Sequence, residues 1–154
     1  MKGGLGKLLL YRGTGPVSKL IERFSGARGP VKYSHAAILY PDGKTVIESY
    51  EGVGVRERGL NDYGFDMEPF DAFDVQGGMD ALRYVRGTAW AKGEIGCGYD
   101  YRGVWHFITG QTGADPDKWY CSEFAQDFFI HAGGPSLLRW PSWMTSPRDG
   151  SGLL

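Results

Sequence analysis

The sequence is short of features that mark several common classes of protein. No run of apolar residues approaches the roughly 18 needed to cross a bilayer, and no block of lysines and arginines occurs. The formal net charge is -1, so charge gives no reason to expect binding to nucleic acid or to an anionic membrane surface. We therefore expect neither of these partners, and no stable membrane anchor.

Cysteine is also scarce. Only Cys97 and Cys121 occur, which is too few for a disulfide scaffold, although a single bridge between them stays open. The apolar run at 8–10 is too short for the core of a signal peptide, and Arg12 follows it closely. We expect no signal peptide and a protein that is made and folded in a cytoplasm.

The chain predicts one domain over residues 1–154, because its length suits a single core and no repeat or linker divides it. Hydrophobic residues make up 42% of it, enough to fill that core. Hydrophobic periodicity and turn signals predict strands over 7–12, 34–40, 45–50, 51–60 and 70–75. They predict helices over 16–26, 79–92, 100–109 and 121–132, with a glycine-rich loop over 93–99. Strands and helices are largely segregated, so we expect an α+β fold with an antiparallel sheet.

Cys121 lies in the stretch WYCSEF, where the predicted final helix begins. The positive end of a helix and its unpartnered backbone N–H groups favour a thiolate over a thiol, and a cysteine nucleophile needs a thiolate. The same N–H groups can hold a developing oxyanion. A free cysteine that fills a gap in the core is an equally good interpretation of this residue alone.

A nucleophilic cysteine needs a base, and the chain offers three histidines. His131 is on the same predicted helix as Cys121 but about 15 Å further along it, too far to reach the sulfur. His106 lies among apolar residues, and we interpret it as an ordinary core or surface histidine. His35 begins a predicted strand beside small residues, which leave room around its ring.

The turn Pro41-Asp42-Gly43-Lys44 predicts a hairpin in which Tyr40 pairs with Thr45. Continuing that register places Ala37 opposite Glu48 and His35 opposite Tyr50. Residues that face each other, or lie two apart on a strand, share one face of a sheet. Glu48 is therefore diagonal to His35 and can orient its ring, unless it lies in water on an exposed strand.

These residues resemble the NlpC-type papain-like cysteine hydrolases, in the circularly permuted branch that includes YiiX-like and LRAT-like proteins. The branch has its histidine early, in a strand, and its cysteine late, at a helix start, as SHA at 34–36 and YCSE at 120–123 do here. The opening LLLYRG, the acidic strand VIE at 46–48 and the element GYD at 98–100 also match its order. The resemblance covers roughly residues 5 to 132 and implies a papain-like fold.

The resemblance implies that Cys121 is the nucleophile, His35 the general base and Glu48 the third member of a triad in acyl transfer. Tyr33, Tyr99 and Tyr120 are the residues we expect to line the substrate cleft, with ordinary core packing as the alternative. Asp100 is expected to cap a helix or tie down a loop, and Cys97 to be structural.

The expected substrate is an amide bond in a peptidoglycan stem peptide, which would make the protein a cell-wall endopeptidase or amidase. The protein would be virion-associated, or released by lysis, if a phage encodes it. Hydrolysis or transfer of a lipid acyl group is a second reading. A catalytically idle structural or binding module, for example one that contacts virion proteins, is the third. We expect no cofactor and no metal, because no close-spaced pair of ligands accompanies Cys121, His35 and Glu48.

Overall fold

The computed structural model describes residues 7–12, 34–62, 70–74, 79–109, 115 and 117–133, with the backbone alone at 106–109. The predicted helix over 16–26, the predicted cleft residue Tyr33 and the tail beyond Pro135 lie outside this part of the chain. The side chain of His106 is also outside it. Each of those predictions therefore stays a prediction.

The centre of the fold is a five-stranded sheet with the strand order β4-β3-β2-β1-β5, in which every neighbouring pair is antiparallel. The five predicted strands are therefore confirmed. Their ends lie within a residue or two of the predicted ends, except that β4 begins three residues later than predicted. The strands are β1 (Lys7–Tyr11), β2 (His35–Leu39), β3 (Thr45–Tyr50), β4 (Gly54–Gly59) and β5 (Phe70–Asp74).

Three helices complete the described fold and confirm the α+β class: α2 (Ala81–Gly93), α3 (Tyr101–Thr109) and α4 (Cys121–His131). Asp80 caps α2 by accepting a 2.8 Å hydrogen bond from the backbone N–H of Arg83, so the helix begins two residues later than predicted. None of the helices in the described ranges is long and apolar enough to cross a membrane.

The prediction of a plain loop over 93–99 was wrong at its end. β6 (Gly98–Tyr99) pairs in parallel with β7 (Lys118–Trp119), which directly precedes α4. Strands of two residues are too short to show an alternating pattern, so periodicity could not reveal them. Their pairing brings Tyr99 close to the start of α4.

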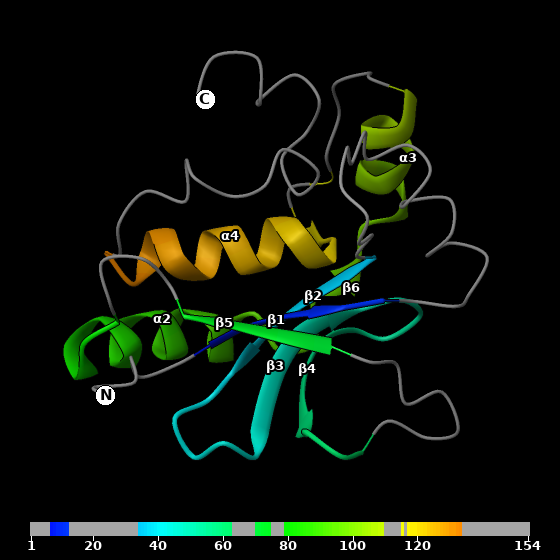
Figure 1. Cartoon of the computed structure of the whole chain (residues 1–154). Coiled ribbons are helices and arrows are strands. Elements are labelled where there is room, and N and C mark those ends of the chain that lie inside the picture. The colour runs from blue at the N-terminus through cyan, green and yellow to red at the C-terminus, as the bar shows by residue number, and fades with distance from the viewer. Residues whose placement is uncertain are drawn as a thin grey trace, which may run out of the picture.

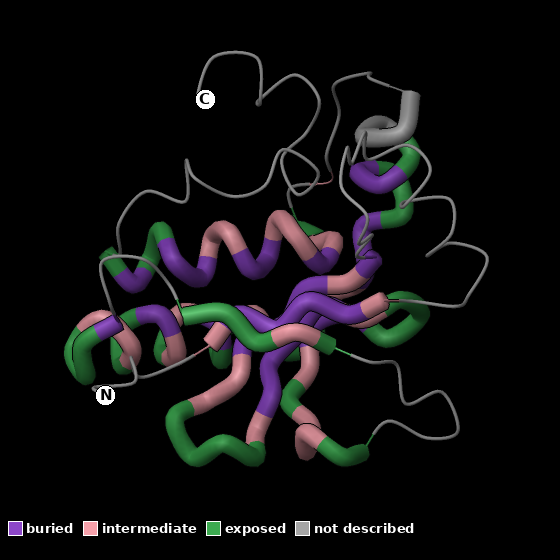
Figure 2. Tube along the Cα trace, viewed as in Figure 1, coloured by how far each residue is buried: buried purple, intermediate pink, exposed green. Residues whose placement is uncertain are grey.

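Helix α4 packs on β2 and β3 at one face of the sheet, and α2 packs against α4 (Figure 1). Figure 2 shows that the side of α4 turned toward the strands is the buried one. The core between them is built from alternate residues of the strands and from small and aromatic residues of the helices. Its buried members are Leu8, Leu10, Ala36, Ile38, Ile47, Val55, Met79, Ala91, Phe124, Ala125, Phe128, Phe129 and Ala132.

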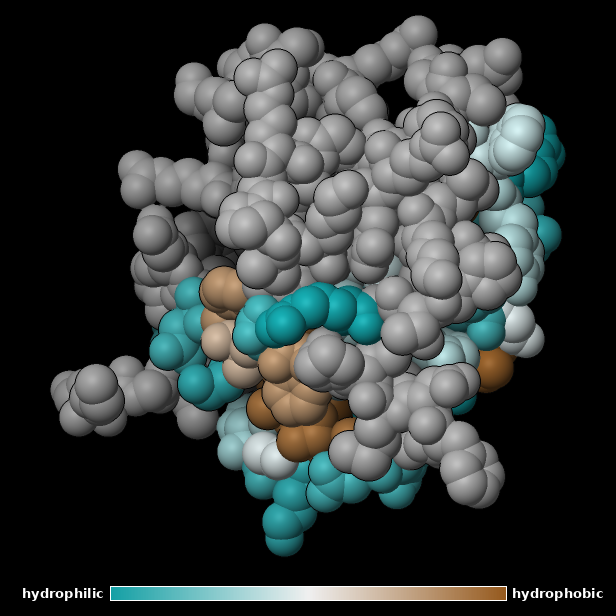
Figure 3. All heavy atoms as spheres, turned by 45° about the vertical axis from the view of Figure 1, so that its right-hand side comes forward, coloured by the Kyte–Doolittle hydropathy of each residue, from teal (hydrophilic) through white to brown (hydrophobic). Residues whose placement is uncertain are grey.

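The opposite face of the sheet is buried as well, at Leu9, Tyr11, Ala37 and Val46. Alternation along the strands places the His35 and Glu48 side chains on this second face, with Ala37 and Val46. On the face drawn in Figure 3, several apolar side chains of the described residues form a patch that is bordered by hydrophilic ones.

The turn between β3 and β4 approaches the segment before β6 closely enough to require glycine at position 54. Gly54 has a φ of 90°, and a Cβ there would overlap the carbonyl oxygen of Cys97. That carbonyl accepts a 2.9 Å hydrogen bond from the N–H of Val55, so the contact holds β4 against the chain leading into β6.

We predict that Gly54→Ala lowers the free energy of unfolding by about 3 kcal/mol or more, because it adds both backbone strain and overlap. Gly43 is the matched control: its φ is 67°, but nothing lies within 4 Å of an added Cβ. Gly43→Ala should cost only about 1–2 kcal/mol of backbone strain. Urea unfolding measures both, and equal losses would contradict the close approach at Gly54.

Candidate active site

The predicted register of the β2–β3 hairpin is confirmed. Ile38 pairs with Ile47 and Leu39 with Val46, and the N–H of Tyr40 donates to the carbonyl of Thr45 at 2.8 Å. The ladder contains no pair closer to the site than Ile38–Ile47. The two strands therefore stop pairing before they reach His35.

The diagonal contact that the register implies is also present. Nε2 of His35 donates to Oε2 of Glu48 at 2.8 Å. The side chain of His35 is 12% exposed and that of Glu48 is fully buried, so the glutamate does not lie in water. Its carboxylate orients the imidazole and leaves the other ring nitrogen, Nδ1, for a further partner.

Cys121 is the first residue of α4, as predicted, and follows an extended N-cap residue, Tyr120, whose side chain makes no capping hydrogen bond. The cysteine is only 5% exposed. Its sulfur lies 3.9 Å from the carbonyl oxygen of Ser34, the length of a weak S–H···O bond. The backbone N–H groups of Ala36 and Ser122 lower the pKa of the thiol, which favours a thiolate.

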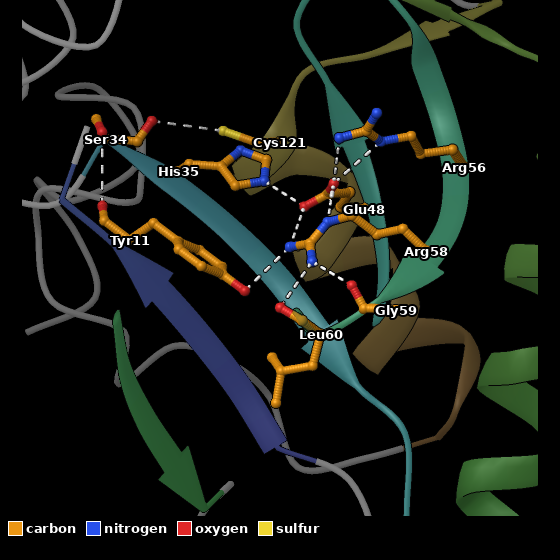
Figure 4. Close-up of polar contacts among 9 residues, drawn as sticks. All are labelled: Tyr11, Ser34, His35, Glu48, Arg56, Arg58, Gly59, Leu60 and Cys121. Atoms are coloured by element: carbon orange, nitrogen blue, oxygen red, sulfur yellow. Dashed lines mark hydrogen bonds and ion pairs between the residues drawn. The ribbon is translucent and has the colours of Figure 1, made fainter. Parts of the chain in front are cut away.

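His35 and Cys121, far apart in the sequence, are coupled electrostatically, since each shifts the pKa of the other. In Figure 4 the Nδ1 edge of the imidazole is turned to the sulfur and the Nε2 edge to Glu48. The structure thus brings all three predicted triad residues together in the order sulfur, imidazole, carboxylate. The rings of Tyr11 and Tyr50, each with its centroid 5.6 Å from that of His35, hold the imidazole between them.

The electrostatics of this chain favour an ion pair. Burial alone would lower the pKa of His35, but the hydrogen bonds and negative charges of Cys121 and Glu48 raise it to about 10. Burial would likewise raise the pKa of the Cys121 thiol, yet the hydrogen bond and charge of His35 and the two backbone N–H groups hold it below its usual value. Both shifts favour a thiolate paired with an imidazolium.

Tyr99, one of the predicted cleft residues, is coupled to the thiol. Burial, together with the charges of Cys121 and Glu51, raises the pKa of the phenol far above its usual value. Tyr99 therefore stays protonated and can act as a donor. The ring of Tyr101 lies 5.0 Å from that of Tyr99 and is 52% exposed.

The other expected residues have local roles. The ring of Tyr120 lies against Gly103 of α3, because a Cβ on that glycine would come within 2.9 Å of it. Asp100 accepts hydrogen bonds from the N–H groups of Gly103 at 2.8 Å and Asp115 at 3.0 Å, so it caps α3 and ties down a loop as predicted. Cys97 is free, as is Cys121, so the bridge between them is not formed.

Two arginines complete the site, and the sequence analysis missed them. Arg56 donates to Oε1 of Glu48 from Nε at 3.1 Å and from a terminal nitrogen at 3.0 Å. Arg58 donates to Oε1 from Nε at 2.7 Å and to Oε2 at 3.2 Å. Burial would raise the pKa of Glu48, but His35 and Arg58 lower it far below its usual value. The register of β4 carried the signal, since Glu48 pairs directly with Arg56.

Within the described residues, no group of three or more His, Cys, Asp and Glu side chains could hold a metal ion. The chain matches no protein-family model, and no curated protein matches it significantly. The chemistry of the site therefore has to be argued from its own geometry.

We predict that Cys121 reacts with iodoacetamide well below the free thiol pKa of about 8.5. His35→Ala should abolish this reactivity near neutral pH, because burial then raises the pKa of the thiol without an imidazolium to lower it. Alkylation rates as a function of pH, measured on a Cys97→Ser background, test both statements. An ordinary thiol titration that ignores His35 would contradict the ion pair.

We also predict that Glu48→Gln costs about 3–5 kcal/mol of stability, because it leaves buried cations uncompensated. The depressed pKa of Glu48 stabilises the fold above the unfolded-state value of about 4.3, and this contribution is lost as the pH falls. The variant should therefore show a shallower loss of stability between neutral and acid pH. Glu57→Gln, at an exposed residue of β4, is the control and should cost less than about 1 kcal/mol. Similar losses in both variants would contradict the role of Glu48.

Proposed function

We propose that this protein is a cysteine hydrolase that cleaves an amide bond through an acyl-enzyme intermediate. Cys121 is the nucleophile, His35 the general base and acid, and Glu48 the residue that orients His35. The observation that carries the proposal is the convergence of the three side chains at the N-terminus of α4. His35 binds Glu48 through Nε2 at 2.8 Å, turns its other nitrogen to the Cys121 sulfur (Figure 4) and is coupled to that sulfur electrostatically.

The chemistry follows from the protonation states at rest. The thiolate of Cys121 attacks the carbonyl carbon of the substrate, and the electron pair of the carbonyl moves onto its oxygen. The backbone N–H of Cys121 and the Tyr99 hydroxyl are the donors in place to stabilise that oxyanion. The imidazolium of His35 then gives its Nδ1 proton to the leaving amine, and a thioester forms. His35 next removes a proton from water, which attacks the thioester and releases the acid.

We further propose that the fold is a circularly permuted papain-like one. The order of the elements supports this: the histidine strand β2 comes early and the cysteine helix α4 comes late. The packing of α4 on an antiparallel sheet, with the acidic residue on the strand next to the histidine, also fits the resemblance noted in the sequence.

The substrate we propose first is the stem peptide of peptidoglycan, which rests on that resemblance. A lipid acyl group is the second candidate, and a specific observation favours it. Tyr101 and Trp105, one helical turn apart on α3, are 52% and 59% exposed, and Tyr101 makes an edge-to-face contact with Tyr99, which is coupled to the thiol. Exposed apolar side chains next to a nucleophile suit an acyl chain.

We predict that wild-type protein releases new amines from purified peptidoglycan and that Cys121→Ala abolishes this release. Mass spectrometry of the wild type incubated with a slowly turned-over ester should show an acyl group on Cys121 and none on Cys97. Cleavage of N-acyl lipids without attack on peptidoglycan would replace the first substrate by the second. No adduct and no product with either substrate, despite a reactive thiol, would favour an idle binding module.

A further inference from the structure

The guanidinium of Arg58 is held on every side by the protein. Its side chain is only 6% exposed. Besides its two bonds to Glu48, it donates to the Tyr11 hydroxyl at 3.0 Å and to the carbonyls of Gly59 at 2.8 Å and Leu60 at 3.4 Å. An arginine has five N–H donors in a rigid planar fork, and here five bonds leave its position no freedom (Figure 4).

The guanidinium of Arg58 also determines how the carboxylate of Glu48 is oriented toward His35. Oε1 accepts from Arg56 and Arg58, whereas Oε2 accepts from Arg58 and from Nε2 of His35. A side-on pair of this kind fixes the plane of the carboxylate. The arginines also keep Glu48 ionised, and an ionised carboxylate can only accept. Nε2 of His35 must therefore carry the proton, and Nδ1 is the nitrogen left to exchange a proton with Cys121.

Arg56 cannot substitute for Arg58. Both of its donors bind Oε1, the oxygen that does not touch His35. Its side chain is 29% exposed and lies over the ring of Tyr50, with the guanidinium carbon 4.0 Å from the ring centroid. Arg58 is the only one of the two that bridges both oxygens of Glu48.

We propose that Arg58 is a positioning residue of the active site, which fixes the Glu48 carboxylate and through it the tautomer and orientation of His35. This inference rests on the proposed function, in which His35 exchanges a proton with Cys121. It adds a fourth residue to the triad, one that touches neither the thiol nor the substrate.

The test compares Arg58→Lys, Arg58→Met and Arg56→Lys on the Cys97→Ser background, using the pH dependence of Cys121 alkylation. Arg58→Lys keeps the charge but loses the fork, so we expect alkylation at neutral pH to fall about tenfold. The pH at which the alkylation rate rises should increase by roughly one unit, which corresponds to a tenfold smaller fraction of thiolate at neutral pH. Arg58→Met, which loses the charge as well, should be slower than Arg58→Lys, and Arg56→Lys should lose clearly less.

Far-UV circular dichroism checks that each variant is folded. If Arg58→Met does not fold, the comparison of Arg58→Lys with Arg56→Lys decides the question, together with the ¹⁵N shifts of the His35 ring. Those shifts should report protons on both nitrogens in wild type at neutral pH, and a larger neutral fraction with mixed tautomers in Arg58→Lys. A wild-type pH profile in a folded Arg58→Lys, or equal losses in the two lysine variants, would overturn the positioning role. An unreactive Cys121 in the wild type would instead overturn the proposed function itself.

Discussion

The buried carboxylate of Glu48 is the constraint on which the site depends. A fully buried anion is costly unless charges and hydrogen bonds compensate it, and here they come from β2, through His35, and from β4, through Arg56 and Arg58. Glu48 itself is on β3, so one side chain ties three strands together. The contact with His35 lies where the β2–β3 ladder has ended and backbone pairing no longer joins those two strands. The interaction that orients the imidazole is thus also the one that holds this end of the sheet.

The end of the β2–β3 ladder also lets the Cys121 sulfur lie beside the backbone of β2. Ala36 lies beyond the last pair of the ladder, and its backbone N–H serves the sulfur of Cys121 instead of a neighbouring strand. The segment before the cysteine is held against β3 by the buried hydroxyl of Ser49, which donates to the carbonyl of Trp119 at 2.6 Å. A nearly buried sulfur thereby gains donors that water would otherwise supply, and the environment favours a thiolate without exposing it.

Much of this site could be predicted from residues that are close together in the sequence. Contacts between residues that are distant in the sequence were not predicted. The register that relates His35 to Glu48 depends on a four-residue turn, and the start of α4 depends on its own periodicity, so both could be predicted from neighbouring residues. The contact of Tyr99 with the thiol depends on two-residue strands whose partners are distant in the chain. The pairing of Glu48 with Arg56 could have been counted across the second hairpin. The burial of Arg58 could not, since it requires Tyr11 from another part of the sequence.

The net charge of the cluster formed by Glu48, Arg56 and Arg58 explains why this cluster suits thiol chemistry, although burying its charges is costly. Two guanidiniums and one carboxylate leave one positive charge beside the Cys121–His35 pair, whichever of the two holds the proton. When the proposed attack moves the negative charge from sulfur to the substrate oxygen, that excess is unchanged. The arginines therefore act as a fixed positive background that needs no rearrangement during the reaction, which is the condition under which protein dipoles and charges stabilise a transition state best. Because His35 and Arg58 hold the pKa of Glu48 far below its usual value, this background keeps its charge over the pH range in which carboxylates ordinarily titrate.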